Sequence, residues 1–153
     1  MPNTYTKIYV QTVFAVKFRD AQLHPDWRKK LFGVIGNTVN QEGCQIIAIN
    51  GVEDHIHCFF ILKPDVAISK IVQLIKGKSS KWINDKGFTT SKFAWQSGYG
   101  AFTYGQSQVN DVVKYIQNQE LHHKKKTFRE EYLKLLEKFD IEYDDAYTFK
   151  EFV

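Results

Sequence analysis

Two histidines separated by one residue are the part of this sequence that most clearly offers chemistry. They lie in Asp54-His55-Ile56-His57-Cys58-Phe59, which reads as a β-strand, and alternation along a strand puts His55 and His57 on one face. Their Cα atoms are expected roughly 6.6 Å apart, close enough for both imidazoles to reach one ion. Neutral imidazole binds several first-row metals, so the pair is a candidate metal site with positions left open for substrate oxygens. The alternative is a pair of hydrogen-bonded core histidines.

A tyrosine and a glutamine four residues apart offer a nucleophile and a further ligand. Tyr115 and Gln119 fall on one face of a predicted helix, because residues i and i+4 are neighbours on a helix surface. His122, three residues further on, lies on the same face. A phenol beside an amide carbonyl can present a nucleophile and a third metal ligand to the same phosphate. The alternative is that Tyr115 borders the core and Gln119 lies on the surface.

A β-α-β-β-α-β order of elements has to position these residues. β-Branched and aromatic residues predict strands over 5–17, 43–50, 53–62 and about 99–104. Apolar spacing predicts helices over 26–41, 67–85 and 108–125. Thr127-Phe128-Arg129-Glu130 matches a capping box that opens a fourth helix. The order predicts an α+β, ferredoxin-like (split βαβ, RRM-like) antiparallel sheet with helices on one face and an extra C-terminal helix.

Length and composition restrict the class of protein. The 153 residues suit a single domain, 1–153, and the 43% hydrophobic content is typical of a globular chain. The longest uncharged apolar run, 56–62, is far too short for a membrane span, and the N-terminus has no signal-peptide pattern. Two cysteines cannot build a disulfide framework or a four-ligand zinc site. We therefore expect a cytoplasmic protein with no membrane segment.

Charge is distributed unevenly along the chain. Residues 1–126 hold 17 Lys and Arg against 9 Asp and Glu, a net charge of +8. The helix and tail from about residue 127 hold 4 against 8, a net charge of −4. This asymmetry favours a basic working surface that binds a polyanion, with the acidic C-terminal part kept away from it. The 15% aromatic content would also suit stacking on bases.

Four segments together resemble one protein family. The His55-Ile56-His57 triplet is similar to the HUH motif, in which a hydrophobic residue separates two histidines, and Tyr115-Ile116-Gln117-Asn118-Gln119 is similar to the Tyr-x-x-x-Gln helix of single-tyrosine transposases. The connecting segments 74–82 and 93–102 are similar as well. In this order and spacing, between about residues 5 and 145, the segments resemble transposases of the insertion-sequence 200/605 type and their REP-associated relatives.

The resemblance implies that the protein cuts and rejoins single-stranded DNA. It implies that His55, His57 and Gln119 hold a divalent cation, Mg²⁺ or Mn²⁺, with no other cofactor. Tyr115 would attack the scissile phosphate to give a 5′-phosphotyrosine and a free 3′-OH, which a different 3′-OH can reverse without ATP. It also implies that the DNA carries hairpins, and that a homodimer shares its sites, the tyrosine helix of one chain completing the histidine site of the other.

Other predicted contacts rest on residue type and position. Candidate phosphate contacts on or after the second helix are Lys70, Lys76, Lys78 and Lys81. A solvated helix face is the alternative for each of these lysines. Trp95 and Tyr99 would either stack on unpaired bases or pack in the core. Asp54 would either hold a metal-bound imidazole in place or serve as a turn residue.

Three other functions account for parts of the sequence. A non-catalytic nucleic-acid-binding module on the same fold explains the basic surface, and predicts that metal removal leaves every activity intact. A domesticated relative that nicks the host's own repeats uses the same chemistry, so only hairpins in the DNA flanking the gene would distinguish it. A metallohydrolase that activates water predicts free 5′-phosphate products and an active Tyr115→Phe variant.

Overall fold

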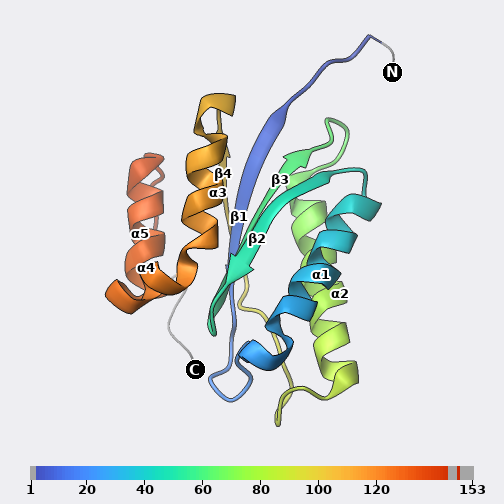
Figure 1. The fold of residues 1–153 in the computed structure, drawn as a ribbon, viewed down its shortest axis with the longest axis vertical. Helices are drawn as coiled ribbons and strands as arrows, with labels where there is room; N and C mark the ends of the chain where they lie inside the picture. The colour runs from blue at the N-terminus through green and yellow to red at the C-terminus, as the bar shows by residue number, and fades with distance from the viewer. Residues whose placement is uncertain (1–2, 145–147, 149–153) are drawn as a thin grey trace.

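A four-stranded antiparallel sheet lies at the centre of the molecule. The computed structural model describes residues 3–144 and 148. Its strands are β1 (Ile8–Ala15), β2 (Gln45–Gly51), β3 (His55–Leu62) and β4 (Gly100–Tyr104). They are ordered β2-β3-β1-β4, with each neighbouring pair antiparallel (Figure 1). With the observed element order this is the split βαβ arrangement, so the expected α+β, ferredoxin-like class is confirmed.

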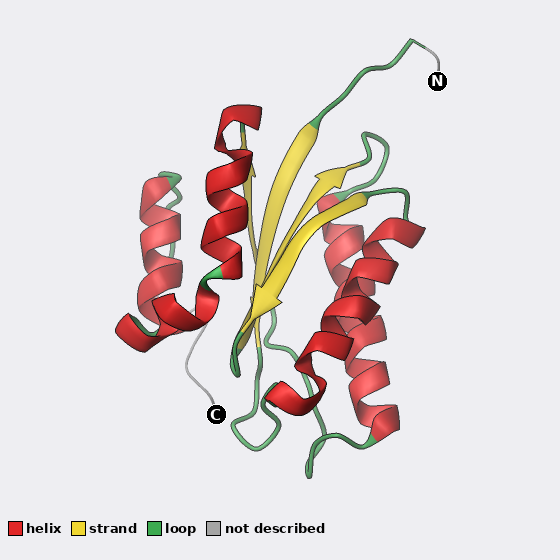
Figure 2. Cartoon of the chain, viewed as in Figure 1, coloured by secondary structure: helices red, strands yellow, loops and turns green. Residues whose placement is uncertain are grey.

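Helices cover both faces of this sheet (Figure 2). One layer consists of α1 (Pro25–Gln41) and α2 (Ile68–Lys86), and the other of α3 (Val109–Gln117), α4 (Gln119–Lys125) and α5 (Phe128–Lys138). We expected the main helices on one face with a single extra C-terminal helix. The second layer forms because alternate strand residues are apolar on both faces, Phe60 on the α1 side and Phe59 on the α3 side.

The segment 108–125 is helical as predicted except that it is not one helix: the structure has two helices that meet at Asn118. A short 3₁₀ turn, Gln106–Gln108, precedes them. The break has a tertiary cause: Asn50 on β2 donates its side-chain amide to the carbonyls of Ile116 and Gln117, at 2.9 and 3.1 Å. These carbonyls would otherwise accept bonds from the next helical turn, so the asparagine ends α3 and lets α4 take a new direction.

The remaining boundaries follow local chemistry. The first strand is shorter than the predicted 5–17, and Tyr5 lies outside it with 90% of its surface exposed. The predicted start of α5 is confirmed, since Thr127 Oγ1 accepts a 3.2 Å hydrogen bond from the Glu130 amide as the N-cap. The Glu130 carboxylate accepts from the Thr127 hydroxyl, at 3.2 Å, and not from the Thr127 backbone amide as in a full capping box. Of the predicted acidic tail, residues 145–147 and 149–153 lie outside the described part of the chain. Among the residues described, no helix is long and apolar enough to cross a membrane.

The turn between β2 and β3 leaves no room for a side chain at Gly51. A Cβ there would lie 3.0 Å from Ile56 Cγ1 and still closer to the backbone carbonyl oxygen of His55. We expect Gly51→Ala to lower the free energy of unfolding by about 1–3 kcal/mol in urea denaturation, because backbone at the start of β3 must move. Gly77→Ala is the matched control. Gly77 lies inside α2, and apart from its chain neighbours and the backbone of its own helix nothing lies within 4 Å of its Cβ position, so that change should stabilise by about 0.5–1 kcal/mol. Equal effects would contradict this account of the turn.

Candidate active site

The predicted histidine pair lies under the layer formed by α3, α4 and α5. His55 and His57 project from β3 on the same face of the sheet, as their spacing requires, and both are 0% exposed. Their ring centroids are 5.1 Å apart. Two adjacent polar rings are therefore fully buried at the start of β3, where each ring nitrogen needs a partner.

A separate side chain orients each ring through its Nδ1 atom. Asp54 Oδ1 lies 2.7 Å from Nδ1 of His55. Gln11, from the neighbouring strand β1, lies with its amide nitrogen 2.8 Å from Nδ1 of His57, and its amide oxygen accepts a 2.6 Å hydrogen bond from Tyr104. Of the two roles predicted for Asp54, the structure shows direct contact with the imidazole of His55. Such contacts fix ring orientation, which is how proteins aim the remaining nitrogen at a ligand.

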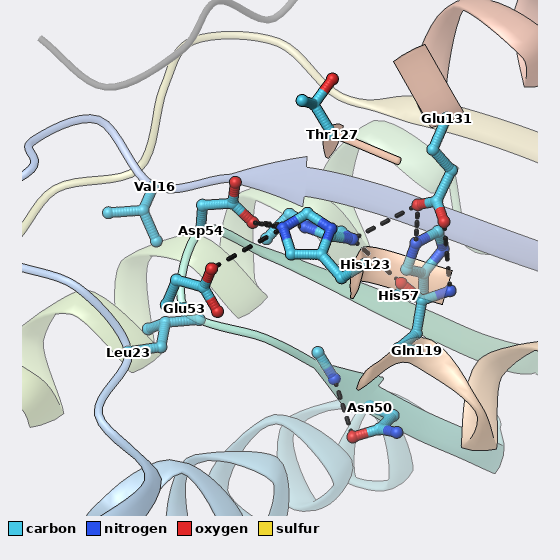
Figure 3. A network of polar contacts seen from close by, with 12 residues as sticks. Val16, Leu23, Asn50, Glu53, Asp54, His57, Gln119, His123, Thr127 and Glu131 are labelled. Atoms are coloured by element: carbon cyan, nitrogen blue, oxygen red, sulfur yellow. Dashed lines mark hydrogen bonds and ion pairs between the residues drawn. The ribbon is translucent and has the colours of Figure 1, made fainter. Parts of the chain in front are cut away.

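The two Nε2 atoms converge on one carboxylate oxygen. Glu131, on α5, places Oε1 2.9 Å from Nε2 of His57 and 3.3 Å from Nε2 of His55. Gln119 lies fully buried at the start of α4, and its Oε1 is 3.0 Å from Nε2 of His55. Figure 3 shows Glu131 and Gln119 approaching His57 from different helices. The predicted meeting of His55, His57 and Gln119 is thus present in the structure.

His55, His57, Gln119 and Glu131 form a cluster, the histidine cluster, and Tyr115 lies beside it on α3. Its half-buried ring packs edge-on against His57, with centroids 5.7 Å apart, and its other side faces His122 at 4.8 Å. Tyr115 and Gln119 reach the histidines of their own chain. A second chain is therefore not needed to bring these four side chains together, although the resemblance implied that two chains share them.

Opposite charges determine the protonation of the cluster. Burial favours a lower pKa for His55, but its hydrogen bonds to Asp54 and Glu131 raise that pKa to about 9. Burial favours a higher pKa for Glu131, but hydrogen bonds from both histidines hold it well below the usual range. Burial lowers the pKa of His57. At neutral pH the cluster therefore holds a charged His55, a neutral His57 and an ionised Glu131.

The phenol of Tyr115 is protonated at neutral pH. Burial raises its pKa, and the nearby Glu131 carboxylate raises it further. A nucleophile of this kind has to lose its proton as it reacts.

The residues fit a divalent cation. His55, His57 and Glu131 offer ligand atoms that all lie within 4.8 Å of one another. Two ligands at right angles around Mg²⁺, each about 2.1 Å from the ion, lie about 3.0 Å apart. The contacts of 2.9, 3.0 and 3.3 Å among Glu131, Gln119 and the two Nε2 atoms match that spacing. Imidazole, amide and carboxylate groups together suit Mg²⁺ or Mn²⁺.

A cleft leads to Tyr115 between α3 and α5. It has a volume of about 820 Å³ and its walls include Tyr115, His122 and Glu131. Four lysines line the same cleft: Lys125, Lys126, Lys134 and Lys138. Asp111, Glu131 and Glu137 line it too, so the cleft combines the candidate nucleophile with four lysines and three carboxylates.

The lysines predicted to contact DNA lie elsewhere. They belong to α2, which covers the face of the sheet opposite the histidines (Figure 1). Lys76 donates to the backbone carbonyls of Gln96 and Gly98 at 2.9 and 2.5 Å, and Lys81 pairs with Asp85 at 2.6 Å. Lys70 and Lys78 are exposed. The structure does not bring these four lysines to the cluster, and their contact with DNA stays a prediction.

The aromatic residues of the 93–102 segment have different surroundings. Trp95 is 9% exposed, packs against Phe14 and Phe93, and donates its indole N–H to Ser79 at 3.0 Å. It is thus a core residue. Tyr99 is 37% exposed.

The sequence analysis missed Glu131, Gln11 and Tyr104. Glu131 had a detectable signal, because it occupies a core-facing position of its helix together with Phe128, Tyr132 and Leu135, at i, i+3, i+4 and i+7 spacing. A carboxylate in an apolar stripe indicates a buried partner. Gln11, together with Thr12, similarly interrupts the apolar residues of β1.

Comparison with known proteins gives the family of this chain. The profile of the family described as "Transposase IS200 like" matches residues 4–119. The transposase for insertion sequence element IS200 from Salmonella typhimurium is 25% identical over 111 residues, which cover 67% of this chain and 72% of the relative. The ISDra2 transposase TnpA from Deinococcus radiodurans is 23% identical over 112 residues, which cover 70% of this chain and 80% of the relative.

Two solved structures share the fold. A proposed transposase from Deinococcus radiodurans superposes with a TM-score of 0.60 at 20% identity, covering 76% of this chain and 94% of that one. A REP-associated tyrosine transposase bound to a REP hairpin gives 0.59 at 19% identity, covering 79% and 72%. Fold and sequence match together define this protein as a transposase, a class that recombines DNA. Within that class, the chain belongs to the IS200-like transposase family.

Proposed function

We propose that this transposase cuts and rejoins single-stranded DNA through a covalent 5′-phosphotyrosine, with the help of a divalent metal. The observation that carries the proposal is that the Nε2 atoms of both histidines converge on one oxygen of Glu131, beside the Tyr115 ring. Membership of the IS200-like family supports DNA as the substrate.

Each residue of the cluster has a role in this reaction. When bound at the histidines, Mg²⁺ or Mn²⁺ supplies Lewis-acid polarisation of the scissile phosphate. Asp54 and Gln11 hold the imidazoles with Nε2 aimed at that position. Gln119 offers its amide oxygen as a further ligand.

Tyr115 is the nucleophile. Its phenolic oxygen forms a bond to phosphorus while the bond between phosphorus and the 3′ oxygen breaks. The strand downstream of the cut therefore stays on the tyrosine through its 5′ phosphate, and the upstream strand is released with a 3′-OH. The phenol gives up its proton as the bond forms, and the departing 3′ oxygen takes one up. Attack by a different 3′-OH reverses the step. The number of phosphate ester bonds is unchanged, so rejoining needs no ATP.

The cleft between α3 and α5 provides a route for the DNA strand. Its lysines neutralise phosphates next to the one that reacts. Lys126 and Lys134 are in contact, and Lys134 lowers the pKa of Lys126. Two neighbouring ammonium groups are stabilised by an anion between them. We place phosphate contacts here, while Lys70, Lys76, Lys78 and Lys81 could serve duplex or hairpin DNA on the opposite side.

The partner we propose is single-stranded DNA that carries hairpins. The hairpin-bound REP-associated transposase supports this choice, because its fold resembles the present one. A homodimer is part of the same proposal, on the basis of the family. Since one chain holds its own Tyr115 over its own histidines, dimerisation would serve DNA pairing rather than assembly of the site.

A cleavage assay on labelled single-stranded DNA with hairpins from the regions flanking the gene tests the function. With Mn²⁺ we expect a protein–DNA adduct that survives denaturation, together with a fragment ending in a 3′-OH. With EDTA both products should disappear, because the phosphate is no longer polarised. The adduct is the decisive product, since water-dependent hydrolysis forms none.

Other outcomes identify the alternatives. Cleavage without an adduct would mean that water is the nucleophile, and DNA binding without cleavage under any metal would leave a binding module. A domesticated nickase would give the same adduct. Inverted-repeat hairpins on both sides of the gene would favour a mobile element over that nickase.

A further inference from the structure

A buried carboxylate occupies the point on which the two histidines converge. Glu131 is 7% exposed, and the same oxygen atom contacts Nε2 of both His55 and His57. Its other oxygen lies 3.5 Å from the amide nitrogen of Gln119. Glu131 therefore touches every side chain that the resemblance assigned to the metal.

Glu131 belongs to α5, so the C-terminal part of the chain supplies this contact. The match to the family profile ends at residue 119, so α5 lies outside the matched segment. The helix packs its apolar side on the core through Tyr132, Leu135 and Leu136. Glu131 projects from the same side, where a leucine would bury more apolar surface. Burying a carboxylate there is costly unless the group has a charged partner.

We propose that Glu131 is a metal ligand, so that α5 adds a carboxylate to the set formed by His55, His57 and Gln119. The inference rests on the proposed function, because it requires a divalent cation at the histidines. The separations of 2.9 and 3.3 Å between Glu131 Oε1 and the two Nε2 atoms suit neighbouring ligands of one ion. Because this oxygen now contacts both Nε2 atoms, an ion between them requires the Glu131 carboxylate to shift from its present position.

The negative charge of Glu131 also favours its role as a metal ligand. The two imidazoles and the Gln119 amide are neutral as ligands, so without Glu131 a dication in this buried site would lack a contacting anion. Carboxylate oxygen is a ligand that Mg²⁺ and Mn²⁺ prefer. Asp54 does not supply that contact, because it lies on the far side of His55, against Nδ1.

Calorimetric titration with Mn²⁺ alone, without DNA, tests the role of Glu131. The informative variant is Glu131→Gln, which keeps the side-chain shape and removes the charge. Its matched control is Glu137→Gln, an exposed position on the same helix. A second control, His57→Ala, removes a histidine ligand. Circular dichroism and thermal unfolding check that each variant folds.

We expect Glu131→Gln to weaken Mn²⁺ binding at least tenfold and Glu137→Gln to leave it unchanged. Binding that is unchanged or tighter in Glu131→Gln overturns the inference, and tighter binding would identify Glu131 as a competitor that must leave before the metal enters. If His57→Ala also binds Mn²⁺ as the natural protein does, the proposed metal site itself fails. The two failures are thereby distinguished.

Discussion

Replacing Tyr115 by phenylalanine is expected to abolish the covalent protein–DNA adduct and to slow cleavage roughly a thousandfold or more, as loss of a catalytic nucleophile does elsewhere. The change removes only the phenolic oxygen. The ring keeps its contacts with His57 and His122, whose centroids lie 5.7 and 4.8 Å away. The fold and the histidine cluster should therefore survive, and the loss should be chemical.

Denaturing gel electrophoresis of labelled DNA measures both the adduct and the cleaved strand. Tyr99→Phe is the matched control, because Tyr99 is exposed in the segment before β4 and lies outside the cleft. It should retain both products. A Tyr115→Phe variant that still cleaves DNA at the normal rate would contradict the assignment of the nucleophile.

A mixture of two inactive variants tests whether chains share their sites. Tyr115→Phe retains the histidines and His57→Ala retains the tyrosine. Because the structure assembles the cluster within one chain, the mixture should stay inactive. Recovery of cleavage in the mixture would show that α3 of one chain reaches the histidines of another.

The fold could be predicted because its signals are local. Alternation along β3 placed His55 and His57 on one face, and Thr127 marked the start of α5. The break at Asn118 could not be predicted in this way. It depends on hydrogen bonds from Asn50, which is more than sixty residues away in the sequence.

The site was predictable where spacing alone brings residues together. His55 and His57 share one face of β3 for that reason. Tyr115 and Gln119 are instead separated by the helix break at Asn118, so they meet the histidines from two different helices. The Thr127 cap that predicts α5 carries no information on Glu131, whose only signal is a charged residue within the apolar stripe of the helix. The lysines of α2 were chosen by type, and type does not reveal which face of the sheet a helix covers.

The acidic character of the C-terminal part now has a structural interpretation at one position. The net negative charge from about residue 127 onward suggested a part of the chain kept away from a basic surface. Glu131 instead lies at the centre of the histidine cluster, while Lys134 and Lys138 of the same helix line the cleft. Net charge over a segment therefore did not describe what α5 contributes to the site.

Replacing His57 by alanine is expected to remove the stabilisation that Mn²⁺ gives and to lower cleavage about a hundredfold or more. At a Mn²⁺ concentration of about 100 times the dissociation constant, one bound ion stabilises a folded protein by about 2.7 kcal/mol. For a chain of this length that corresponds to a rise in melting temperature of roughly 5–10 °C. His57→Ala should show no such rise, because one of the two converging Nε2 atoms is gone.

Comparing each protein with and without Mn²⁺ separates the metal effect from the loss of packing. His57 is fully buried, so its removal lowers the melting temperature in either condition, and only the difference reports on the ion. His122→Ala is the control: its ring contacts Tyr115 in the cleft but lies outside the group of converging ligand atoms. It should keep the full Mn²⁺-dependent rise. An equal loss of the rise in both variants would mean that Mn²⁺ binds in the cleft, and the metal would then have to be placed beside Tyr115 and His122 instead of at β3.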